Sequence, residues 1–457
     1  MAAELLLADL AGKQPVGAHL QEWLDGARQL LAAGEAVRAR LALDTVLQAA
    51  EHCLEAHVLL VHTHLALGPS HWQRALAAAR DGVATCCALA DVSAEDRAAC
   101  HLALGLALGS VARLTAMPQA DRSRDRSEAR AVLAAAAAED GAHRVASLYA
   151  LALIDAEGGH YDTAVRHAQH ALEAAEAGGA GGGAPLAPPA APIVALLALL
   201  LSARQQPQAA LTVVEAGLAS VGGADRCDAP APAAGAGASL AGLRLPWCYD
   251  VLLCRVRAAL LLALADANGA LGVLGAAKQR LSLARRALEA RGPDAGAAAG
   301  VLRQQEAQVW RDLALAYVGQ RQPADAQLCV EAAAALEPHS AATYHAAGCV
   351  AAARKDAVAA KAAYKAALAV DAAHPPALLS LGALLRRQGD PHDLSVAASL
   401  LTDALRYEPL NHVAWFNLGL ARNLQGHTAE GERHLFTAVT LAAAAPVLAY
   451  SELPLSI

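Results

Sequence analysis

Hydrophobic and small residues recur with a fixed period in the last third of the chain. Four large residues, Trp310, Tyr344, Leu378 and Trp415, stand 34, 34 and 37 residues apart. Each is followed three residues later by leucine or alanine and four residues later by glycine or alanine. Two further rows of small residues follow in phase: Ala326, Ala360, Ala397 and Gly431, then Ala333, Ala367, Ala404 and Ala438. This spacing predicts two antiparallel helices per unit, with small residues where the helices approach closely.

A period of about 34 residues with this pattern is typical of the tetratricopeptide repeat. A chance alanine-rich helical bundle is the alternative, but it would not keep phase over so many positions. Pro338 and Pro409 stand where two of the units end, and proline stops helices. We therefore predict an all-α tetratricopeptide-repeat α-solenoid, a right-handed superhelix of helix pairs. Its units are placed at 307–340, 341–374, 375–411 and 412–445.

The same pattern continues upstream in a looser form. Leu148 belongs to a unit that begins near residue 145, Val194 to one that begins near residue 191, and Trp23 to a further unit. Downstream of Trp23 the helical periodicity continues, but its phase is not fixed. The predicted organisation is divergent helical repeats in 1–144, tetratricopeptide-like repeats in 145–220, a linker and a helical pair in 221–306, four repeats in 307–445 and a C-terminal tail in 446–457.

Three segments rich in Gly, Ala and Pro interrupt the repeats, at 177–192, 222–242 and 292–300. Such composition cannot bury enough apolar surface to offset the entropy of ordering, so we expect flexible connections. A fourth segment, Asp121–Arg126, mixes acidic residues with arginine. Its mixed charges favour a solvated loop over a phosphorylatable arginine patch.

Two segments are strongly apolar, Val194–Ala203 and Val251–Ala265. The first is shorter than the roughly 20 residues that a bilayer span needs, and the second contains Arg255 and Arg257. Both are predicted to be buried solenoid helices. The run Leu5–Leu7 is too short for a secretory signal. We expect a cytoplasmic protein without a transmembrane segment, for which peripheral recruitment to the plasma membrane stays open.

Composition agrees with an all-helical chain and narrows the classes of partner. Hydrophobic residues make up 56% of the sequence but aromatic residues only 3%, and Ala and Leu are strong helix formers. The formal net charge of −7 argues against general nucleic-acid binding. The nine cysteines include no CxxC pair. This favours free, mostly buried thiols in a reducing compartment over a disulfide framework.

Motifs that would carry catalysis are missing from the sequence. It contains no GxxxxGK[ST] phosphate loop, no GxSxG elbow and no GxGxxG between a strand and a helix. His62 and His64 are two residues apart, which places them on different helix faces, and the sequence offers no further ligands for a metal. Helix-surface histidines are the favoured interpretation. The sequence predicts no enzyme, no metal site and no cofactor.

A solenoid of this kind offers a concave groove lined by the first helix of each unit. Positions one, two and five after each anchor are the candidates to face it. The candidates are Arg311, Asp312, Leu315, His345, Ala346, Cys349, Leu379, Ser380, Ala383, Phe416, Asn417 and Leu420. They do not repeat the Lys, Arg and Asn of a carboxylate clamp, which disfavours a co-chaperone. A mixed apolar groove suits an amphipathic helix or an extended segment of a partner. The alternative is that the chain's own helices or tail cover part of this surface.

One stretch, between Leu271 and Arg291, has the pattern of a basic amphipathic helix. Its basic residues alternate with leucines, and its one acidic residue is Glu289. Such helices occur in calmodulin targets and on anionic membrane surfaces. A solenoid helix with a basic solvent face is the more frequent explanation. The candidate calmodulin-binding residues are Lys278, Arg280, Arg285, Arg286 and Arg291.

Several runs of residues resemble one known family. They include 326–331, 336–341, 382–385, 389–392, 398–406 and 414–419, together with the three-residue insertion before Ala397. In these runs the chain looks like the plant no-pollen-germination proteins, which are similar to animal tetratricopeptide repeat protein 7. Two departures are the Gly/Ala/Pro-rich connections and an N-terminal helical region shorter than the family's.

The resemblance implies a scaffold, because proteins like these hold a type III phosphatidylinositol 4-kinase alpha at the plasma membrane. Plant members are also described as calmodulin binders. The function expected from the resemblance is a non-catalytic, protein-binding subunit of such a lipid-kinase complex. The alternative is a calmodulin-binding adaptor without a kinase partner.

Overall fold

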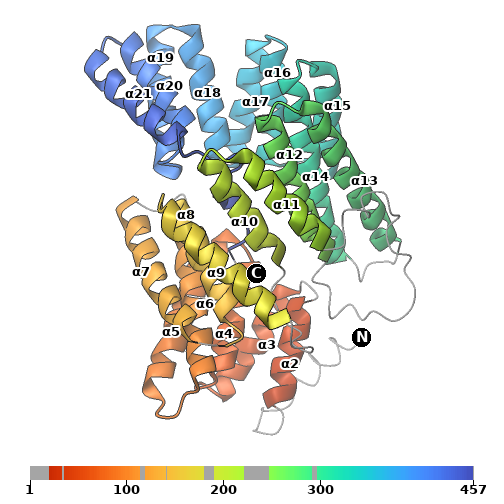
Figure 1. The fold of residues 1–457 in the computed structure, drawn as a ribbon, viewed down its shortest axis with the longest axis vertical. Coiled ribbons are helices and arrows are strands. Elements are labelled where there is room, and N and C mark those ends of the chain that lie inside the picture. Colours follow the sequence, from red (N-terminus) through yellow and green to blue (C-terminus); the bar gives the residue numbers. More distant parts are fainter. Residues whose placement is uncertain are drawn as a thin grey trace. The chain divides into compact units, whose positions relative to one another are not determined.

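The computed structural model describes residues 20–32, 35–113, 119–139, 141–179, 190–220, 246–290 and 296–455. Within these ranges the chain forms α-helices, two short 3₁₀ helices and no strand, which confirms the all-α tetratricopeptide solenoid (Figure 1). The chain divides into two compact units. Of the described residues, unit 1 contains those within 20–197, 246–249 and 450–455, and unit 2 contains those within 198–220 and 250–449.

Unit 1 is a succession of antiparallel helix pairs. Its helices are α2 (Leu20–Ala32), α3 (Ala36–Ala49), α4 (Leu54–Ala66), α5 (Trp72–Ala88), α6 (Ala94–Ala112), α7 (Gln119–Ala138), α8 (Arg144–Glu157) and α9 (Tyr161–Gly179). Each contacts the next along the chain, and α2, α4, α6 and α8 also contact one another in sequence. The pair that Trp23 was expected to begin is α2 and α3. The pairs whose phase the sequence left open are α4 with α5 and α6 with α7.

Unit 2 continues the same architecture in six helix pairs, from α10 with α11 to α20 with α21, and the first of these helices is α10 (Ala190–Ala203), whose residues up to Leu197 belong to unit 1. Its helices after α10 are α11 (Pro207–Ser220), α12 (Pro246–Ala263), α13 (Ala267–Glu289), α14 (Gly296–Gly319), α15 (Pro323–Leu336), α16 (Ala341–Ala353), α17 (Ala357–Val370), α18 (Pro375–Gln388), α19 (Pro391–Tyr407), α20 (His412–Leu424) and α21 (Thr428–Ala442). Helices α15 and α19 end just before Pro338 and Pro409, as the sequence predicts.

The turn inside each helix pair from α8 to α21 contains one residue with a left-handed backbone. Glycine fills this position in the pairs α8/α9, α18/α19 and α20/α21, whereas other residues fill it in the four pairs between α10 and α17. In chain order they are Gly159, Gln205, Ala265, Arg321, Lys355, Gly389 and Gly426, with φ between 60° and 87°. The repeated conformation reverses the chain direction within a few residues.

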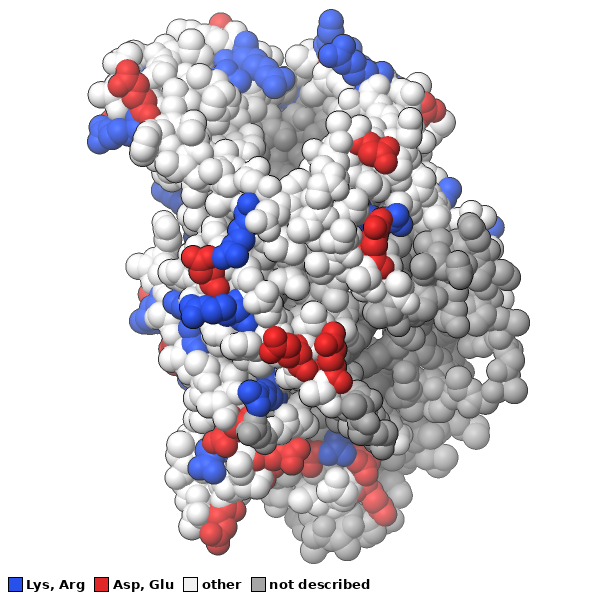
Figure 2. Space-filling model, in the orientation of Figure 1, with Lys and Arg blue, Asp and Glu red and all other residues white. Residues whose placement is uncertain are grey.

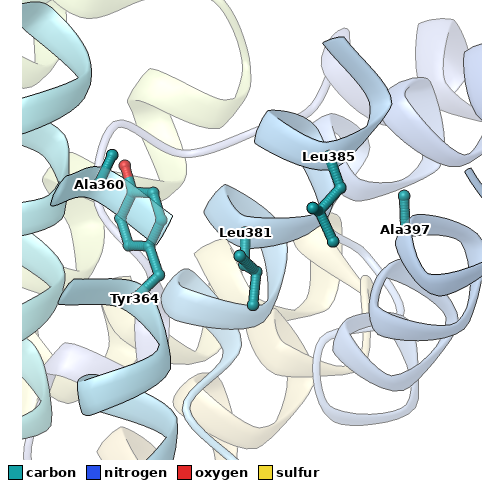
Figure 3. Packing of buried hydrophobic residues seen from close by; sticks show 5 residues of the cluster. All are labelled: Ala360, Tyr364, Leu381, Leu385 and Ala397. Atoms are coloured by element: carbon teal, nitrogen blue, oxygen red, sulfur yellow. The ribbon is translucent and has the colours of Figure 1, made fainter. Parts of the chain in front are cut away.

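The small residues of the repeat lie where two helices touch. A Cβ atom at Gly348 would stand 2.4 Å from Cε1 of Tyr364, and one at Gly382 would stand 2.8 Å from Cγ of Leu401. Between the pairs α16/α17 and α18/α19, the buried side chains form one apolar cluster (Figure 3). Its residues are Ala360, Tyr364, Leu381, Leu385 and Ala397. Close helix approach and interdigitated large side chains therefore stabilise each junction.

Both strongly apolar segments are buried solenoid helices, as predicted. Residues 191–200 of α10 are all buried, and α12 buries side chains that include Leu253, Val256 and Leu260. Among the described residues no helix is both long and apolar enough to cross a membrane.

Three sequence-based expectations about loops need correction. Asp121–Arg126 is not a solvated loop, because it lies within α7, where Arg122 and Asp125 are buried. The expected connection at 292–300 is helical from Gly296 onward. The ends of the expected connection at 177–192 also belong to α9 and α10. Residues 180–189, 222–242 and 292–295 lie outside the described residues.

His64 is a further correction. It is buried, not a surface histidine, and its ring stacks on that of His71 with the centroids 5.7 Å apart. Among the described residues no group of three or more His, Cys, Asp or Glu side chains is placed to hold a metal ion.

Candidate partner-binding surface

The first helices of the four C-terminal pairs form a continuous row in unit 2. Helix α14 contacts α16, α16 contacts α18, and α18 contacts α20. The second helices α15, α17 and α19 instead contact the first helix of the following pair. We call the surface of α14, α16, α18 and α20 the first-helix row. All the predicted groove residues lie on these four helices.

The structure separates these residues by exposure. Leu315 and Phe416 are exposed, with 42% and 46% of their surface accessible, whereas Arg311 and Asn417 are buried at 7% and 6%. Ala346 is also buried, and the others are half-buried: Asp312, His345, Cys349, Leu379, Ser380, Ala383 and Leu420. Among the predicted groove residues, the two most exposed side chains are therefore apolar, and the two large buried ones are polar.

Arg311 joins two neighbouring repeats. One guanidinium nitrogen, Nη1, donates to Glu337 Oε2 at 2.6 Å and to Thr343 Oγ1 at 3.3 Å, and Nη2 donates to Gln308 Oε1 at 2.6 Å. Glu337 caps the C-terminal end of α15, and Thr343 lies in the first turn of α16. Its neighbour Asp312 accepts hydrogen bonds from Arg255 at 2.5 Å and from Gln308 at 3.1 Å. Both charges serve internal contacts.

His345, Cys349 and Ser380 form one polar cluster between α16 and α18. The Nε2 atom of His345 lies 3.0 Å from Ser380 Oγ and 3.5 Å from Cys349 Sγ. The Tyr364 hydroxyl donates to Cys349 Sγ at 3.7 Å. The ring of His374 lies edge-on to that of His345, with the centroids 5.9 Å apart. The predicted positions therefore meet, but around side chains from α17 and the α17–α18 turn.

Burial sets the protonation of this cluster. It lowers the pKa of His345 to about 4, with a smaller contribution from the neighbouring His374. It also raises the pKa of the Cys349 thiol and of the Tyr364 hydroxyl. The imidazole and the thiol are consequently neutral near pH 7, so Cys349 has little thiolate character. The cluster suits a structural role in holding α16 and α18 together.

Asn417 is the corresponding polar contact between α18 and α20. Its Oδ1 accepts a hydrogen bond from Arg386 Nε at 3.1 Å, and its Nδ2 donates to the Val413 carbonyl at 2.8 Å. Sequence reasoning did not identify Arg386, Tyr364 or His374 as partners of the predicted residues. The repeat pattern could not identify these partners, because none of them stands one, two or five residues after an anchor residue.

Several apolar side chains of the first-helix row are exposed. Besides Leu315 and Phe416, Val413 on α20 is 41% exposed. On the face in view in Figure 2, acidic and basic residues are interspersed over a largely uncharged surface. Interspersed charges of both signs do not form the basic patch that binding to a polyanion requires.

The basic segment between Leu271 and Arg291 lies in α13, and its leucines belong to the core. Leu274, Leu281 and Leu288 are buried, whereas Leu283 is 44% exposed. Lys278 lies over the Trp310 ring, with Nζ 4.8 Å from the centroid. Arg280 is half-buried, Arg286 is exposed, and Arg291 lies outside the described residues.

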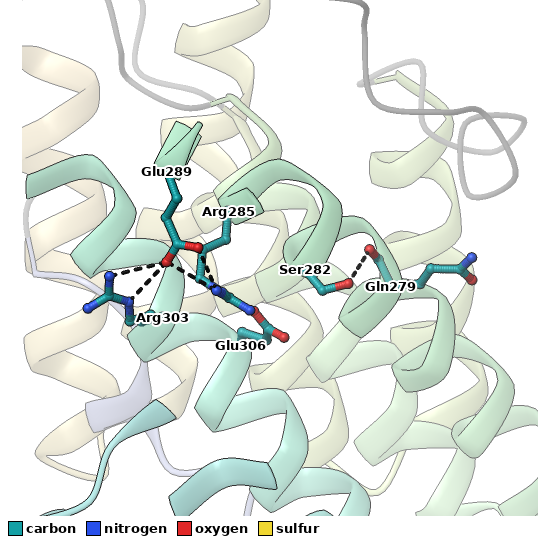
Figure 4. A network of polar contacts seen from close by, with 6 residues as sticks. All are labelled: Gln279, Ser282, Arg285, Glu289, Arg303 and Glu306. Atoms are coloured by element: carbon teal, nitrogen blue, oxygen red, sulfur yellow. Dashed lines mark hydrogen bonds and ion pairs between the residues drawn. The ribbon is translucent and has the colours of Figure 1, made fainter. Parts of the chain in front are cut away.

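Arg285 is the centre of an ion-pair network between α13 and α14 (Figure 4). Its Nε donates to Glu306 at 2.8 Å and its Nη1 to Glu289 at 2.9 Å. Arg303 also donates to Glu289, at 3.1 Å. Hydrogen bonds to Glu306 and then to Glu289 raise the pKa of Arg285. The Arg285 side chain therefore makes its contacts within the solenoid.

Comparison with known proteins identifies homologues. Protein NPG1 of Arabidopsis thaliana is 32% identical over 148 residues, which cover 32% of this chain and 21% of that protein. Tetratricopeptide repeat protein 7B of Homo sapiens is 30% identical over 148 residues, 32% of this chain and 17% of that protein. The chain thus matches about a fifth of the length of these curated relatives. The resemblance to the no-pollen-germination and tetratricopeptide repeat protein 7 proteins is confirmed. No family model matches the chain.

Among solved structures, the chain resembles that of Ypp1. The TM-score is 0.58 at 12% sequence identity, and the match covers 93% of this chain and 60% of Ypp1. At this identity the likeness shows a shared fold.

Proposed function

We propose that the protein is a non-catalytic scaffold that binds a partner through the first-helix row. The observation that carries this proposal is the exposure of Leu315 and Phe416 on helices α14 and α20, whereas the neighbouring Arg311 and Asp312 are held in contacts within the solenoid. An apolar side chain that is exposed on the folded chain can gain burial in a complex, at about 25 cal/mol per Å² of apolar area. The tetratricopeptide homologues support the same class of function.

The partner we propose is a phosphatidylinositol 4-kinase assembly at the plasma membrane. This part of the proposal rests on the family resemblance. Recruitment to the membrane would then occur through the assembly.

The proposal is tested by affinity purification of the full chain from cells, followed by mass spectrometry. The test variant carries Leu315→Glu and Phe416→Glu, which place charges on the first-helix row. The matched control carries Leu328→Glu and Phe436→Glu on the second helices α15 and α21, where these side chains are 63% and 73% exposed. We expect the wild type and the control to recover the lipid kinase, and the test variant to lose at least about 90% of it.

Three results would contradict parts of the proposal. Equal recovery by the test variant and the control would remove the first-helix row as the binding surface. Recovery of calmodulin alone would favour the adaptor alternative. Recovery of chaperones would favour a co-chaperone.

The calmodulin-binding alternative has weaker support, because α13 uses three leucines in the core and Arg285 in an ion-pair network. The exposed Leu283 and Arg286 are what remains for a ligand. Arg286→Glu tests the alternative without disturbing Arg285. Calcium-dependent capture of the wild type but not of the variant would support it, and equal capture would exclude Arg286 from the interaction. Capture of a peptide of residues 267–291 but not of the folded chain would show that binding requires release of α13.

A further inference from the structure

Residues 450–455 lie against helices α6 and α8 of unit 1. Tyr450, Leu453 and Leu455 are buried, at 7%, 2% and 8% exposure, while Pro454 between the two leucines is exposed. After the turn Tyr450–Glu452, residues 453–455 thus alternate between buried and exposed side chains, as in a short extended peptide. The 3₁₀ turn Tyr450–Glu452 contacts α8 directly. This arrangement has the geometry of a peptide ligand on a tetratricopeptide surface.

The helices hold the backbone of this segment with side-chain donors. The Tyr149 hydroxyl on α8 donates to the Pro454 carbonyl at 2.7 Å, and Arg113 Nη1 at the end of α6 donates to the Leu453 carbonyl at 3.3 Å. Arg113 is oriented by Glu157, which accepts from its Nε at 2.8 Å. Contacts to carbonyl groups do not depend on the ligand's side chains, so they would hold any segment with this backbone path.

Specificity comes from the leucines. Gly109 on α6 leaves the space that Leu455 fills: a Cβ atom at residue 109 would stand 2.9 Å from Cδ2 of Leu455 and 3.1 Å from Cδ1 of Ile154. Leu453, two residues before Leu455, is almost completely buried. The site therefore selects two leucines separated by one residue.

The segment is an imperfect occupant. The Tyr450 hydroxyl is buried and has no hydrogen-bond partner among the described residues. Its ring lies 6.4 Å from that of Tyr161. A buried hydroxyl without a partner weakens binding, so a ligand with phenylalanine at this position would bind more tightly.

We propose that this face of α6 and α8 is a docking site for an extended segment of a partner protein, one that carries an aromatic residue followed by a Leu-x-Leu motif. In the isolated chain residues 450–455 occupy the site. The partner segment replaces them, and it must outcompete a ligand whose effective concentration is raised by its covalent link. The site is independent of the first-helix row of unit 2.

The test uses a fluorescent peptide of residues 446–457 and the full chain with Leu453→Asp and Leu455→Asp, which vacates the site. Fluorescence anisotropy is expected to show at least about tenfold tighter binding to this vacated chain than to the wild type. A peptide carrying the same two aspartates should not bind. A peptide with Tyr450→Phe should bind at least about fivefold more tightly. Circular dichroism checks that the vacated chain is folded, and Leu455→Ala is the milder variant if it is not.

A second substitution locates the binding. Adding Gly109→Val to the vacated chain fills the Leu455 pocket and should abolish binding, whereas Gly141→Val, where a Cβ meets nothing within 4 Å, should not. Absence of peptide binding to a folded, vacated chain would overturn the proposal, as would binding that Gly109→Val leaves unchanged. A wild-type dimer that Leu455→Asp dissociates would instead assign the site to a second copy of the chain.

Discussion

His345 shows how burial gives a single residue a measurable signature. Its imidazole packs against Tyr364 and His374 and contacts Ser380, and its pKa falls to about 4 from the ordinary value of 6.5. In the unfolded chain the imidazole takes up a proton near pH 6.5, but in the folded chain it stays neutral until about pH 4. Below pH 6.5 the unfolded state binds more protons, so the folded state loses stability as pH falls through this window.

We predict that His345→Gln flattens this pH dependence. The full effect of one such shift is about 3 kcal/mol, since one pKa unit corresponds to about 1.4 kcal/mol. Urea unfolding of the wild type and the variant at several pH values between 7 and 4 measures it, with the difference between the two chains isolating His345 from the other buried histidines. Parallel curves for the two chains would show that His345 is protonated equally in both states.

Gly348 tests the close approach of helices within a repeat. Gly348→Ala places a methyl group against the buried ring of Tyr364, so we predict a loss of about 1–3 kcal/mol in unfolding free energy. Gly272→Ala on α13, where a Cβ meets nothing within 4 Å, is the matched control and should add about 0.5–1 kcal/mol. Denaturant titrations of both variants give the comparison. Stabilisation by both would mean that Tyr364 moves aside without cost.

At the scale of helices, Arg311 links α14, the end of α15 and the start of α16. Arg311→Ala leaves Glu337 without its charged partner in a partly buried site, so we predict a loss of about 2–4 kcal/mol. The control is Arg406→Ala on α19, which removes an exposed pair with Asp403 and should cost less than about 0.5 kcal/mol. Chemical denaturation measures both. A similar, small effect for the two would show that the Arg311 contacts contribute little to the stability of the solenoid.

Helices were predictable where glycine or alanine marks the contact between two of them. Gly348, Gly382 and Gly419 fall at such contacts, and the pairs from α14 to α21 follow the predicted spacing. The phase of α4 to α7 was not predictable, because residues 102–112 of α6 are all buried and have no polar face to give a period.

Contacts between residues distant in sequence could not be predicted from the repeat pattern either. The charged segment Asp121–Arg126 was assigned to a loop, since nothing in the sequence shows that α7 buries two of its charges. Arg311 and Asn417 lie on first helices, and their role in a groove stays a prediction. Their partners Glu337 and Arg386 are not at repeat positions and could not be predicted. The contact of Tyr149 with Pro454 spans 305 residues and has no local signal.

At the scale of the whole molecule, the stability of a repeat protein is approximately the sum of the stabilities of its repeats and of the interfaces between neighbouring repeats. Each helix pair contacts mainly its neighbours in sequence, as repeat proteins do. The C-terminal residues depart from this rule: Ala443 and Val447 hydrogen-bond to Gln205 and Ser202, and residues 450–455 pack within unit 1. Within the described residues, long-range contacts of the C-terminal residues are thus added to the short-range contacts between neighbouring pairs.

Some turns between the helices contain non-glycine residues in the left-handed conformation, and substituting glycine there should raise the melting temperature of the chain. Gln205, Ala265, Arg321 and Lys355 carry side chains in a conformation that costs L-residues about 1–2 kcal/mol. Replacing Ala265 and Lys355 by glycine should raise the melting temperature, by amounts that add because the turns are far apart in sequence. Ala362→Gly, at an exposed position inside α17, should lower it. Calorimetry of the single and double variants would show whether a thermostable form of the chain can be engineered from its turns alone, with every partner-facing side chain left as it is.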